Sequence, residues 1–317
     1  MFAGMLKRGL LSGLKTTWTL GRVIFPVTLI VSIIQYTPIL GWIVNVISPL
    51  MKVLGLRGEA AIPLVLGNLL NLYAGIGGIL SLDLTVKEVF IIAVMLSFSH
   101  NLLIETSVAL KVGVRLWVIL TVRIGLALLS AIVINAVWSG GGELARYASL
   151  NRGSAEISGA WPILLNGVET ALLGIMKLAI IVIPLMIVIQ ILKELKWLEK
   201  FSEMLGPLMK LLGMNKNASM TMASGLVLGL AYGAGVMIQA VQEDGVSKKD
   251  ATLAFIFLVA CHAVVEDTLI FVPLGIPVWP LLLIRVATAF ILTMIISSLW
   301  KRSETVNARK EASYEHI

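Results

Sequence analysis

The chain has 317 residues, of which 58% are hydrophobic and only 14% charged, and its mean hydropathy is +0.96. This composition excludes an ordinary soluble domain and predicts an integral membrane protein. The net charge of +7 does not indicate nucleic-acid binding, because most basic residues flank apolar segments, where they orient membrane helices. The single cysteine, Cys261, excludes an internal disulfide.

The first half of the chain predicts a short lead-in followed by a set of membrane helices. Residues 1–17 are basic and amphipathic and lack a signal-peptide pattern, so we expect them on the cytoplasmic side. Residues 18–139 form the first repeat, because their apolar runs are long or numerous enough for helices that cross a bilayer. The expected spans are 18–36, 87–109 and 114–138, with a short helical pair at 41–55 and 60–79 that crosses or re-enters.

The second half follows a polar linker. Residues 140–162, GGGELARYASLNRGSAEISGAWP, are rich in glycine and serine and are expected outside the hydrocarbon. Residues 163–300 form the second repeat, and residues 301–317, KRSETVNARKEASYEHI, form a cytoplasmic tail.

The two halves are copies of one unit. At an offset of 158, Pro-Leu-Met-Lys at 49–52 matches the same four residues at 207–210. After a four-residue insertion the offset becomes 162. The matched pairs are then His100 with His262, Glu105 with Asp267, Thr106 with Thr268, Trp117 with Trp279, and Arg123 with Arg285. Chance does not explain five such residues in unchanged order, so the chain is an internal repeat.

The number of crossings in each repeat is odd, five or three, so the second repeat is expected to enter the membrane upside down. The distribution of lysine and arginine supports this, because most of these residues then fall on the side of the N-terminus. We therefore expect a multi-pass protein of the cell (inner) membrane with both termini in the cytoplasm. Inverted repeats are a common construction of secondary transporters, with the substrate site near the midplane.

Ionisable residues inside these spans are the strongest functional signal, because each costs at least about 2.5 to 3.5 kcal/mol on insertion scales. They are His100, Asn101, Glu105 and Thr106 in the first repeat, and His262, Glu266, Asp267 and Thr268 in the second. Histidine and acid are five residues apart, which places them about 140° apart on a continuous helix. They converge only if each helix is broken, near Asn101 and near Val264, or if each meets the other repeat.

Three interpretations of this cluster remain open. His100, Glu105, His262 and Asp267 suit a divalent transition metal or a proton relay. Alternatively, the carboxylates and Asn101 hydrogen-bond an organic solute. In the third interpretation, Glu105 and Asp267 pair with Arg123 and Arg285 as charge partners and only lock the helices together, which leaves the histidines unexplained.

Glycine-rich stretches are the second signal, LGNLLNLYAGIGG at 66–78 and SGLVLGLAYGAG at 224–235. They allow close helix packing or an unwound turn. In the second case Asn68, Asn71 and Tyr73 of the first repeat and Ser224 and Tyr232 of the second line the substrate path. The sequence contains no nucleotide-binding loop in a suitable context and no recognisable catalytic triad or zinc-protease motif. We therefore expect no enzyme activity and no bound cofactor, with a divalent cation or proton only as substrate or coupling ion.

Four stretches carry a resemblance to the nucleoside-recognition or Gate domain family of membrane proteins. They are LVLGNLLNLYAGIG (64–77), MLSFSHNLLIETSVALKVG (95–113), GLAYGAGVMIQ (229–239) and CHAVVEDTLIFVPLG (261–275). The resemblance implies two Gate units in one chain, related to the Gate modules of ferrous-iron permeases, to spore maturation membrane proteins and, more distantly, to concentrative nucleoside transporters. The chain differs from the iron permeases in having no cysteine in AIPLVLG, 61–67, and no GTPase domain.

Together these observations predict an all-α polytopic membrane protein of two inverted-topology repeats, each with about three full spans plus a re-entrant or short helical pair. The predicted function is movement of a small solute or cation by alternating access, at a site between the repeats near the midplane. The alternative is a non-transporting membrane scaffold in envelope or spore assembly. The expected partners are the lipid bilayer, a small solute or ion and a second copy in a homo-oligomer, but not nucleic acid.

Overall fold

The computed structural model describes residues 2–34, 37–145, 147, 159–243 and 245–314. Within these ranges the chain is helical, and its only extended pairing is an isolated bridge between Thr85 and Leu144. The prediction of an all-α membrane protein is confirmed. Most of the polar linker expected at 140–162 and the last three residues of the tail lie outside the described residues.

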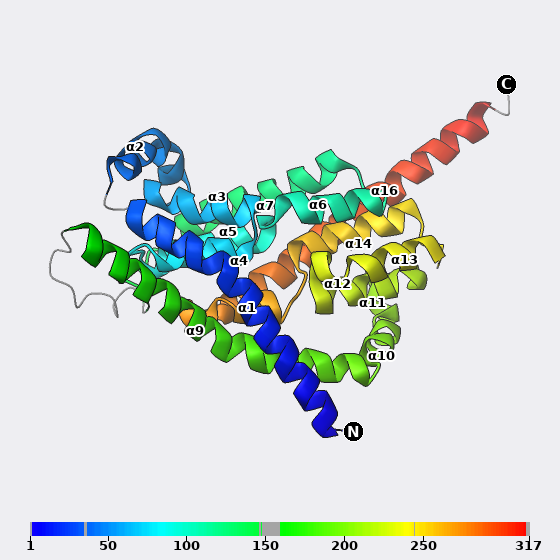
Figure 1. Cartoon of the computed structure of the whole chain (residues 1–317). Coiled ribbons are helices and arrows are strands. Elements are labelled where there is room, and N and C mark those ends of the chain that lie inside the picture. Colours follow the sequence, from blue (N-terminus) through cyan, green and yellow to red (C-terminus); the bar gives the residue numbers. More distant parts are fainter. Residues whose placement is uncertain (1, 35–36, 146, 148–158, 244, 315–317) are drawn as a thin grey trace.

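In the described part of the first half, the structure has seven α-helices. Figure 1 shows their arrangement. They are α1 (Phe2–Ile34), α2 (Pro38–Val53), α3 (Ala61–Leu69), α4 (Leu72–Leu80), α5 (Val86–Ser99), α6 (Leu102–Lys111) and α7 (Leu116–Val137), with a 3-10 turn at Gly58–Ala60. Helix α1 is continuous across residue 17, so the expected lead-in and the first span form one helix.

The second half repeats this order with more interruptions. Its helices are α9 (Ala160–Glu194), α10 (Trp197–Met204), α11 (Gly206–Leu211), α12 (Ser219–Tyr232), α13 (Ala234–Glu243), α14 (Lys248–Ala260), α15 (Glu266–Leu269) and α16 (Val278–Tyr314), with 3-10 turns at Lys216–Ala218 and Val272–Leu274. Helix α16 continues past residue 300 into the expected tail.

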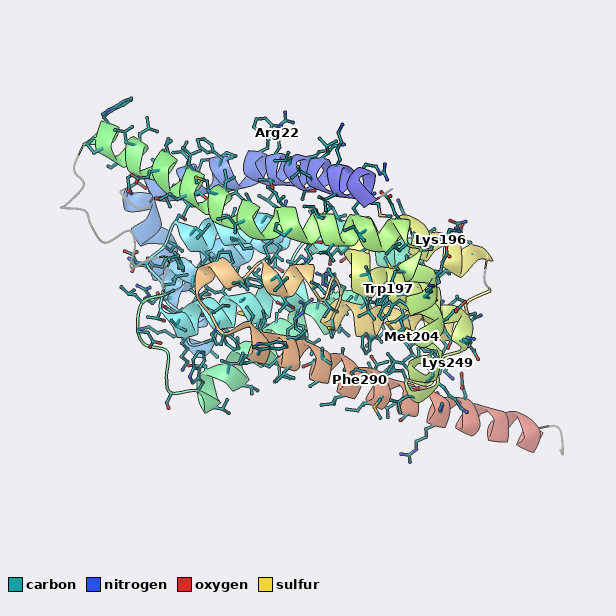
Figure 2. The ribbon with its side chains drawn as sticks, turned by 90° about the horizontal axis from the view of Figure 1, so that it is seen from below. Arg22, Lys196, Trp197, Met204, Lys249 and Phe290 are labelled. Atoms are coloured by element: carbon teal, nitrogen blue, oxygen red, sulfur yellow. The ribbon has the colours of Figure 1, made fainter. Side chains whose placement is uncertain are left out.

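Helices α1 and α9 occupy equivalent places in the two repeats and pack against each other in antiparallel directions. A Cβ atom at Gly9 would lie 2.7 Å from Ile187 Cα, one at Gly13 would lie 2.9 Å from Ile183 Cα, and Gly21 faces Ile175. Residue numbers therefore rise along α1 as they fall along α9. Small residues allow this close approach of the two backbones. Figure 2 shows the pair along one edge of the molecule and α16 along the opposite edge.

Three segments of the described residues are long and apolar enough to cross a membrane, namely Val86–Lys111, Leu116–Val137 and Val278–Glu304. They differ in burial. In the most apolar part of the first segment, which comprises α5 and α6, 83% of the residues are buried, whereas in the corresponding parts of α7 and α16 only 28% are buried. Helices α5 and α14 both pack against α7 and α16, so the two buried helices lie inside two peripheral ones. The two histidines, His100 and His262, come directly after these buried helices.

The starts of α5 and α14 are fixed by the same device in each repeat. Thr85 accepts a hydrogen bond from the Glu88 amide, and Ser247 accepts one from the Asp250 amide. Each acid also accepts a hydrogen bond from the backbone amide of the residue before the 3-10 turn of its repeat, Arg57 in one and Asn215 in the other. Helix caps of this kind satisfy free amides and hold the entry of the chain into the helix.

Candidate functional site

Two helical segments are broken in each repeat, and all four breaks line one cavity. In the first repeat the chain leaves the helical conformation between α3 and α4, at Leu70–Asn71, and between α5 and α6, at His100–Asn101. In the second repeat, α12 is interrupted at Gly229, which has φ 78° and ψ 174°, and residues 261–265 separate α14 from α15. Broken helices expose backbone groups that can bind a solute or ion inside a membrane protein.

The breaks beside the histidines have the same backbone geometry. Asn101 and Ala263 adopt left-handed conformations, with φ of 51° and 41°. The Asn101 amide donates to Gly67 O at 2.8 Å, and the Ala263 amide donates to the equivalent Gly225 O at 3.0 Å. A left-handed conformation is unfavourable for alanine, so these contacts and the surrounding packing must hold it.

The cavity has a volume of about 280 Å³. Its lining residues are Asn71, Leu72, Tyr73, His100, Asn101, Ile104, Glu105, Leu228, Gly229, Leu230, Ala231, His262, Ala263, Glu266 and Asp267. It is therefore built from both repeats, and seven of the ten residues predicted as binding or coupling groups reach it. The amide oxygen of Asn101, a residue only 9% exposed, has no hydrogen-bond partner among the described residues.

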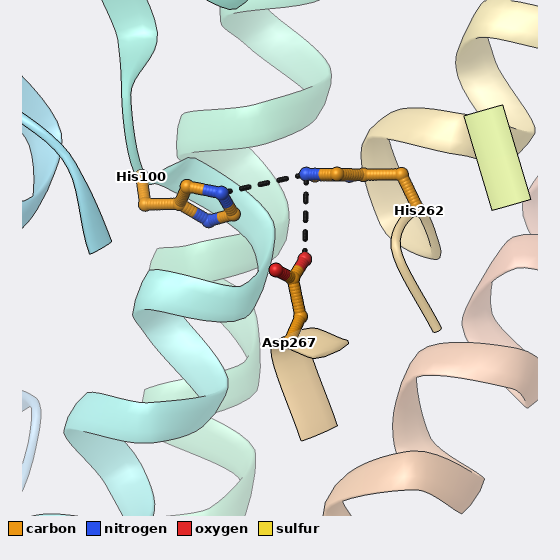
Figure 3. A group of neighbouring side chains, drawn as sticks. All are labelled: His100, His262 and Asp267. Carbon is orange, nitrogen blue, oxygen red and sulfur yellow. Dashed lines mark hydrogen bonds and ion pairs between the residues drawn. The ribbon is translucent and has the colours of Figure 1, made fainter. Parts of the chain in front are cut away.

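The two histidines face each other across the boundary between the repeats (Figure 3). His100 Nδ1 lies 2.6 Å from Leu96 O, and His262 Nδ1 lies 2.8 Å from Leu258 O. A carbonyl oxygen can only accept, so each Nδ1 carries a proton. The two Nε2 atoms lie 3.4 Å apart. In two neutral imidazoles both would present lone pairs to each other.

Three carboxyl groups surround the imidazoles. Glu105 Oε1 lies 3.2 Å from His100 Nε2 and 3.5 Å from His262 Nε2, and Asp267 Oδ2 lies 3.5 Å from His262 Nε2. Glu266 is further from the centre and accepts a hydrogen bond from Tyr73 across the repeat boundary at 2.6 Å. Among the described residues, Glu266 forms no ion pair with an arginine or lysine.

Each predicted arginine partner lies beside its acid and also binds the broken backbone. Arg123 pairs with Glu105 at 2.8 Å and donates to Phe98 O and His100 O. Arg285 pairs with Asp267 at 3.1 Å and donates to His262 O at 2.6 Å. Both arginines are fully buried. The guanidinium groups therefore neutralise two carboxylates and satisfy carbonyls that the helix ends leave free.

Three predicted residues lie away from the cavity. Asn68 donates to Leu64 O within its own helix at 2.7 Å, and Thr268 donates to Val264 O at 2.6 Å and accepts from Arg285. Thr106 is buried, and its hydroxyl has no partner among the described residues. Ser224, which was also expected to line the substrate path, donates to Thr221 O at 3.0 Å and does not line the cavity, and the Tyr232 side chain lies outside the described part of the structure.

The segment Leu228–Ala231 lines the cavity, although none of its residues was predicted as a site residue. It surrounds the interruption at Gly229, inside the glycine-rich stretch that was expected to allow an unwound turn. The available signal is positional. Gly229 lies 158 residues after Asn71, so the two breaks occupy the same place in their repeats.

Comparison with known proteins identifies the family. Residues 17–115 and 175–276 match the family described as nucleoside recognition, or Gate, with one segment in each repeat. The chain belongs to the Gate family. It is also 64% identical over 304 residues to a protein of Bacillus subtilis (strain 168) described as "Uncharacterized membrane protein YvoD", covering 96% of this chain and 97% of that protein. No solved structure matches this Gate-family chain.

Proposed function

We propose that this Gate-family protein is a transporter that moves a small solute or cation across the membrane by alternating access, and that it is not an enzyme. The observation that carries the proposal is the single cavity at which four helix breaks from two repeats meet around two facing histidines. A scaffold needs neither broken helices nor buried titratable groups that lack a locking partner.

The charges of the cavity favour a positively charged cargo or coupling ion. Glu105, Asp267 and Glu266 carry three negative charges when ionised, whereas Arg123 and Arg285 carry two positive charges. When both histidines are neutral, their facing Nε2 lone pairs add to this negative potential. A cation or a proton between the imidazoles would reduce the excess negative charge and the repulsion between the lone pairs, because electrostatic interactions are strong in a site with little water.

An inverted arrangement of the repeats supports alternating access. Helices α1 and α9 occupy equivalent positions and run antiparallel, as expected if the second repeat is inserted upside down. In inverted-repeat transporters, one half moves against the other around a fixed central site. We further propose that both termini face the cytoplasm, because the basic segment ends then lie mainly on that side.

The test is uptake by the purified protein in proteoliposomes. Uridine, adenosine, Mn²⁺, Co²⁺ and Zn²⁺ would be offered separately, with and without a pH gradient. We expect concentration of at least one probe, and loss of that flux in Glu105→Gln and Asp267→Asn without loss of folding. Asn68→Ala is the matched control, because its side chain bonds its own helix outside the cavity, and its flux should equal that of the wild type.

The opposite result would favour the scaffold. A wild-type protein that folds normally, is inserted in the vesicles and moves none of the five probes under either condition would overturn transport of these two chemical classes. Because each acid variant leaves a buried arginine unpaired, a loss of stability in the variants alone does not favour the scaffold, and the flux of the wild-type protein decides.

A further inference from the structure

We propose that His100, His262 and Glu105 form a binding site for one divalent transition-metal ion, with a carboxylate oxygen of Asp267 beside it as the fourth ligand. The inference deepens the proposed function, since the ion would be the cargo or the coupling ion of the transporter. It rests on the distances among the ligand atoms, the groups behind them and their distribution over the two repeats.

The distances fit a metal better than a network of hydrogen bonds. His100 Nε2, His262 Nε2 and Glu105 Oε1 form a nearly equilateral triangle with sides of 3.2, 3.4 and 3.5 Å. Charge-assisted hydrogen bonds between nitrogen and oxygen are shorter, about 2.7–2.9 Å. An ion about 2.0–2.1 Å from each ligand in tetrahedral geometry separates the ligand atoms by about 3.3–3.4 Å. The triangle therefore has the size of one face of such a tetrahedron.

Asp267 is the nearest further candidate for a fourth ligand. Its Oδ2 is 3.5 Å from His262 Nε2, and ligand atoms of His100, His262 and Asp267 all lie within 4.8 Å of one another. All of these side chains are buried. Imidazole nitrogen with carboxylate oxygen suits zinc, cobalt and manganese, whereas calcium and magnesium require six or more oxygen-type ligands.

The groups behind the ligands are those that orient metal-binding side chains. Each imidazole donates its Nδ1 proton to a backbone carbonyl, Leu96 O or Leu258 O, which leaves Nε2 free to coordinate. Glu105 binds Arg123 through Oε2, which leaves Oε1 facing the histidines. Such outer partners fix the tautomer and the direction of a ligand.

The third carboxyl group offsets part of the charge of a divalent ion. The two arginines already neutralise Glu105 and Asp267, so a divalent ion alone would leave two positive charges in a buried space. Glu266 supplies one further negative charge at the cavity wall and is held there by Tyr73. Loss of this charge should weaken binding without removing a ligand.

The ligands come from both halves of the protein, which favours a transported ion over a permanent structural one. His100 and Glu105 belong to the first repeat, and His262 and Asp267 belong to the second. Movement of one half against the other would pull the ligand set apart and release the ion.

The test is titration of the purified protein in detergent with Co²⁺, followed by visible absorption. Tetrahedral Co²⁺ absorbs intensely in the visible range, whereas hydrated octahedral Co²⁺ is nearly colourless. We expect one equivalent to bind with a tetrahedral spectrum, and Zn²⁺ to displace it. Asn68→Ala should bind as the wild type does, and Glu266→Gln should keep the spectrum but bind about tenfold more weakly, as expected for one lost charge.

Ligand variants make the test specific. His100→Gln and Glu105→Gln should each lower Co²⁺ affinity by more than the roughly 10–100-fold that loss of an outer partner costs. Because a glutamine variant can fail to fold, His262→Cys gives a second measurement. Its thiolate should add a sulfur-to-cobalt charge-transfer band in the near ultraviolet that the wild type lacks, although the wild type contains Cys261.

The outcomes separate this inference from the proposed function. A folded wild-type protein that does not bind Co²⁺, or a tetrahedral band that is unchanged in His100→Gln while His262→Cys adds no near-ultraviolet band, would overturn the metal site even if uridine or adenosine is transported. Binding of Co²⁺ with the expected variant effects, but without flux of any probe, would establish the metal site and overturn transport.

Discussion

The two repeats share a backbone design around the cavity but differ in their side chains. Equivalent breaks, equivalent carbonyls of Gly67 and Gly225 and equivalent arginines hold both halves in the same way. In contrast, Ile104 of the first repeat corresponds to Glu266 of the second, and Tyr73 corresponds to Ala231. The comparison teaches that the break is the common structural requirement, whereas the side chains beside it are free to differ between the halves.

The largest effect is expected from the shared part of the design. Arg123→Gln and Arg285→Gln each leave a buried carboxylate unpaired and backbone carbonyls unsatisfied, so each should lower the stability of the protein by about 3–5 kcal/mol. Thermal unfolding in detergent would measure this.

A double variant provides the control. Combining Arg123→Gln with Glu105→Gln should recover much of the loss, because no unpaired charge remains. If the stability loss of the double variant equals the sum of the losses in the two single variants, Arg123 and Glu105 are not energetically coupled. The arginine contact then does not stabilise the fold through its carboxylate partner.

The breaks in α12 and between α3 and α4 differ in how they are made. Gly229 has backbone angles that only glycine adopts readily, and a Cβ there would lie 3.1 Å from Ala263 Cβ. Gly229→Ala should therefore cost about 1–3 kcal/mol. Asn71 is extended, with φ −168°, so Asn71→Ala should lose only the cap on Ala74, about 1 kcal/mol. Equal losses in denaturation experiments would contradict this difference.

The carboxyl group of Glu266, which has no counterpart in the first repeat, should affect transport more than folding. In Glu266→Ile the second repeat acquires the residue type of the first, and flux of a cationic probe should fall about tenfold or more at subsaturating concentration. The side chain is half-buried and bonded only to Tyr73 among the described residues, so unfolding temperature should change little. Unchanged flux of a transported cation would remove Glu266 from the binding site.

The helix caps at the far ends of α5 and α14 sharpen the comparison further. Thr85→Ala and Ser247→Ala should each cost about 1 kcal/mol. The two losses should be similar, because each hydroxyl accepts from the amide of the acid three residues later and donates to the carboxylate of that acid. Chemical denaturation of both variants in the same detergent measures the two losses, and clearly unequal values would contradict this equivalence.

The smallest effect is expected at the exposed contact between α1 and α9. Hydrogen bonds from Arg8 and Gln190 lower the pKa of Glu194 to about 2, from an unfolded value of about 4.3. The stabilisation is therefore present above pH 4.3 and is lost as the pH falls toward 2. Glu194→Gln should remove this small pH dependence of unfolding, and the exposed Glu199→Gln should not.

Much of this arrangement could be predicted from the sequence, because the repeat offsets and the cost of buried charge are properties of the chain alone. The five-residue spacing of histidine and acid required a break, and the breaks occur at Asn101 and next to Val264. The sequence could not exclude Asn68 or Thr268 from the cavity lining, since each side chain donates to the backbone carbonyl four residues before it. Nor could it reveal that Arg123 and Arg285 donate to backbone carbonyls. Backbone contacts leave no residue pattern.

Each arginine of the cavity bonds only to its own repeat, as far as the described contacts extend. The described polar contacts that bridge the divide at the cavity are the imidazole pair, His262 with Glu105, and Tyr73 with Glu266. If the two halves move against each other in the proposed transport cycle, each arginine therefore stays paired with its own acid. No buried ion loses its partner during the movement, and the energetic barrier comes mainly from the few side chains that contact each other, or a bound ion, across the boundary.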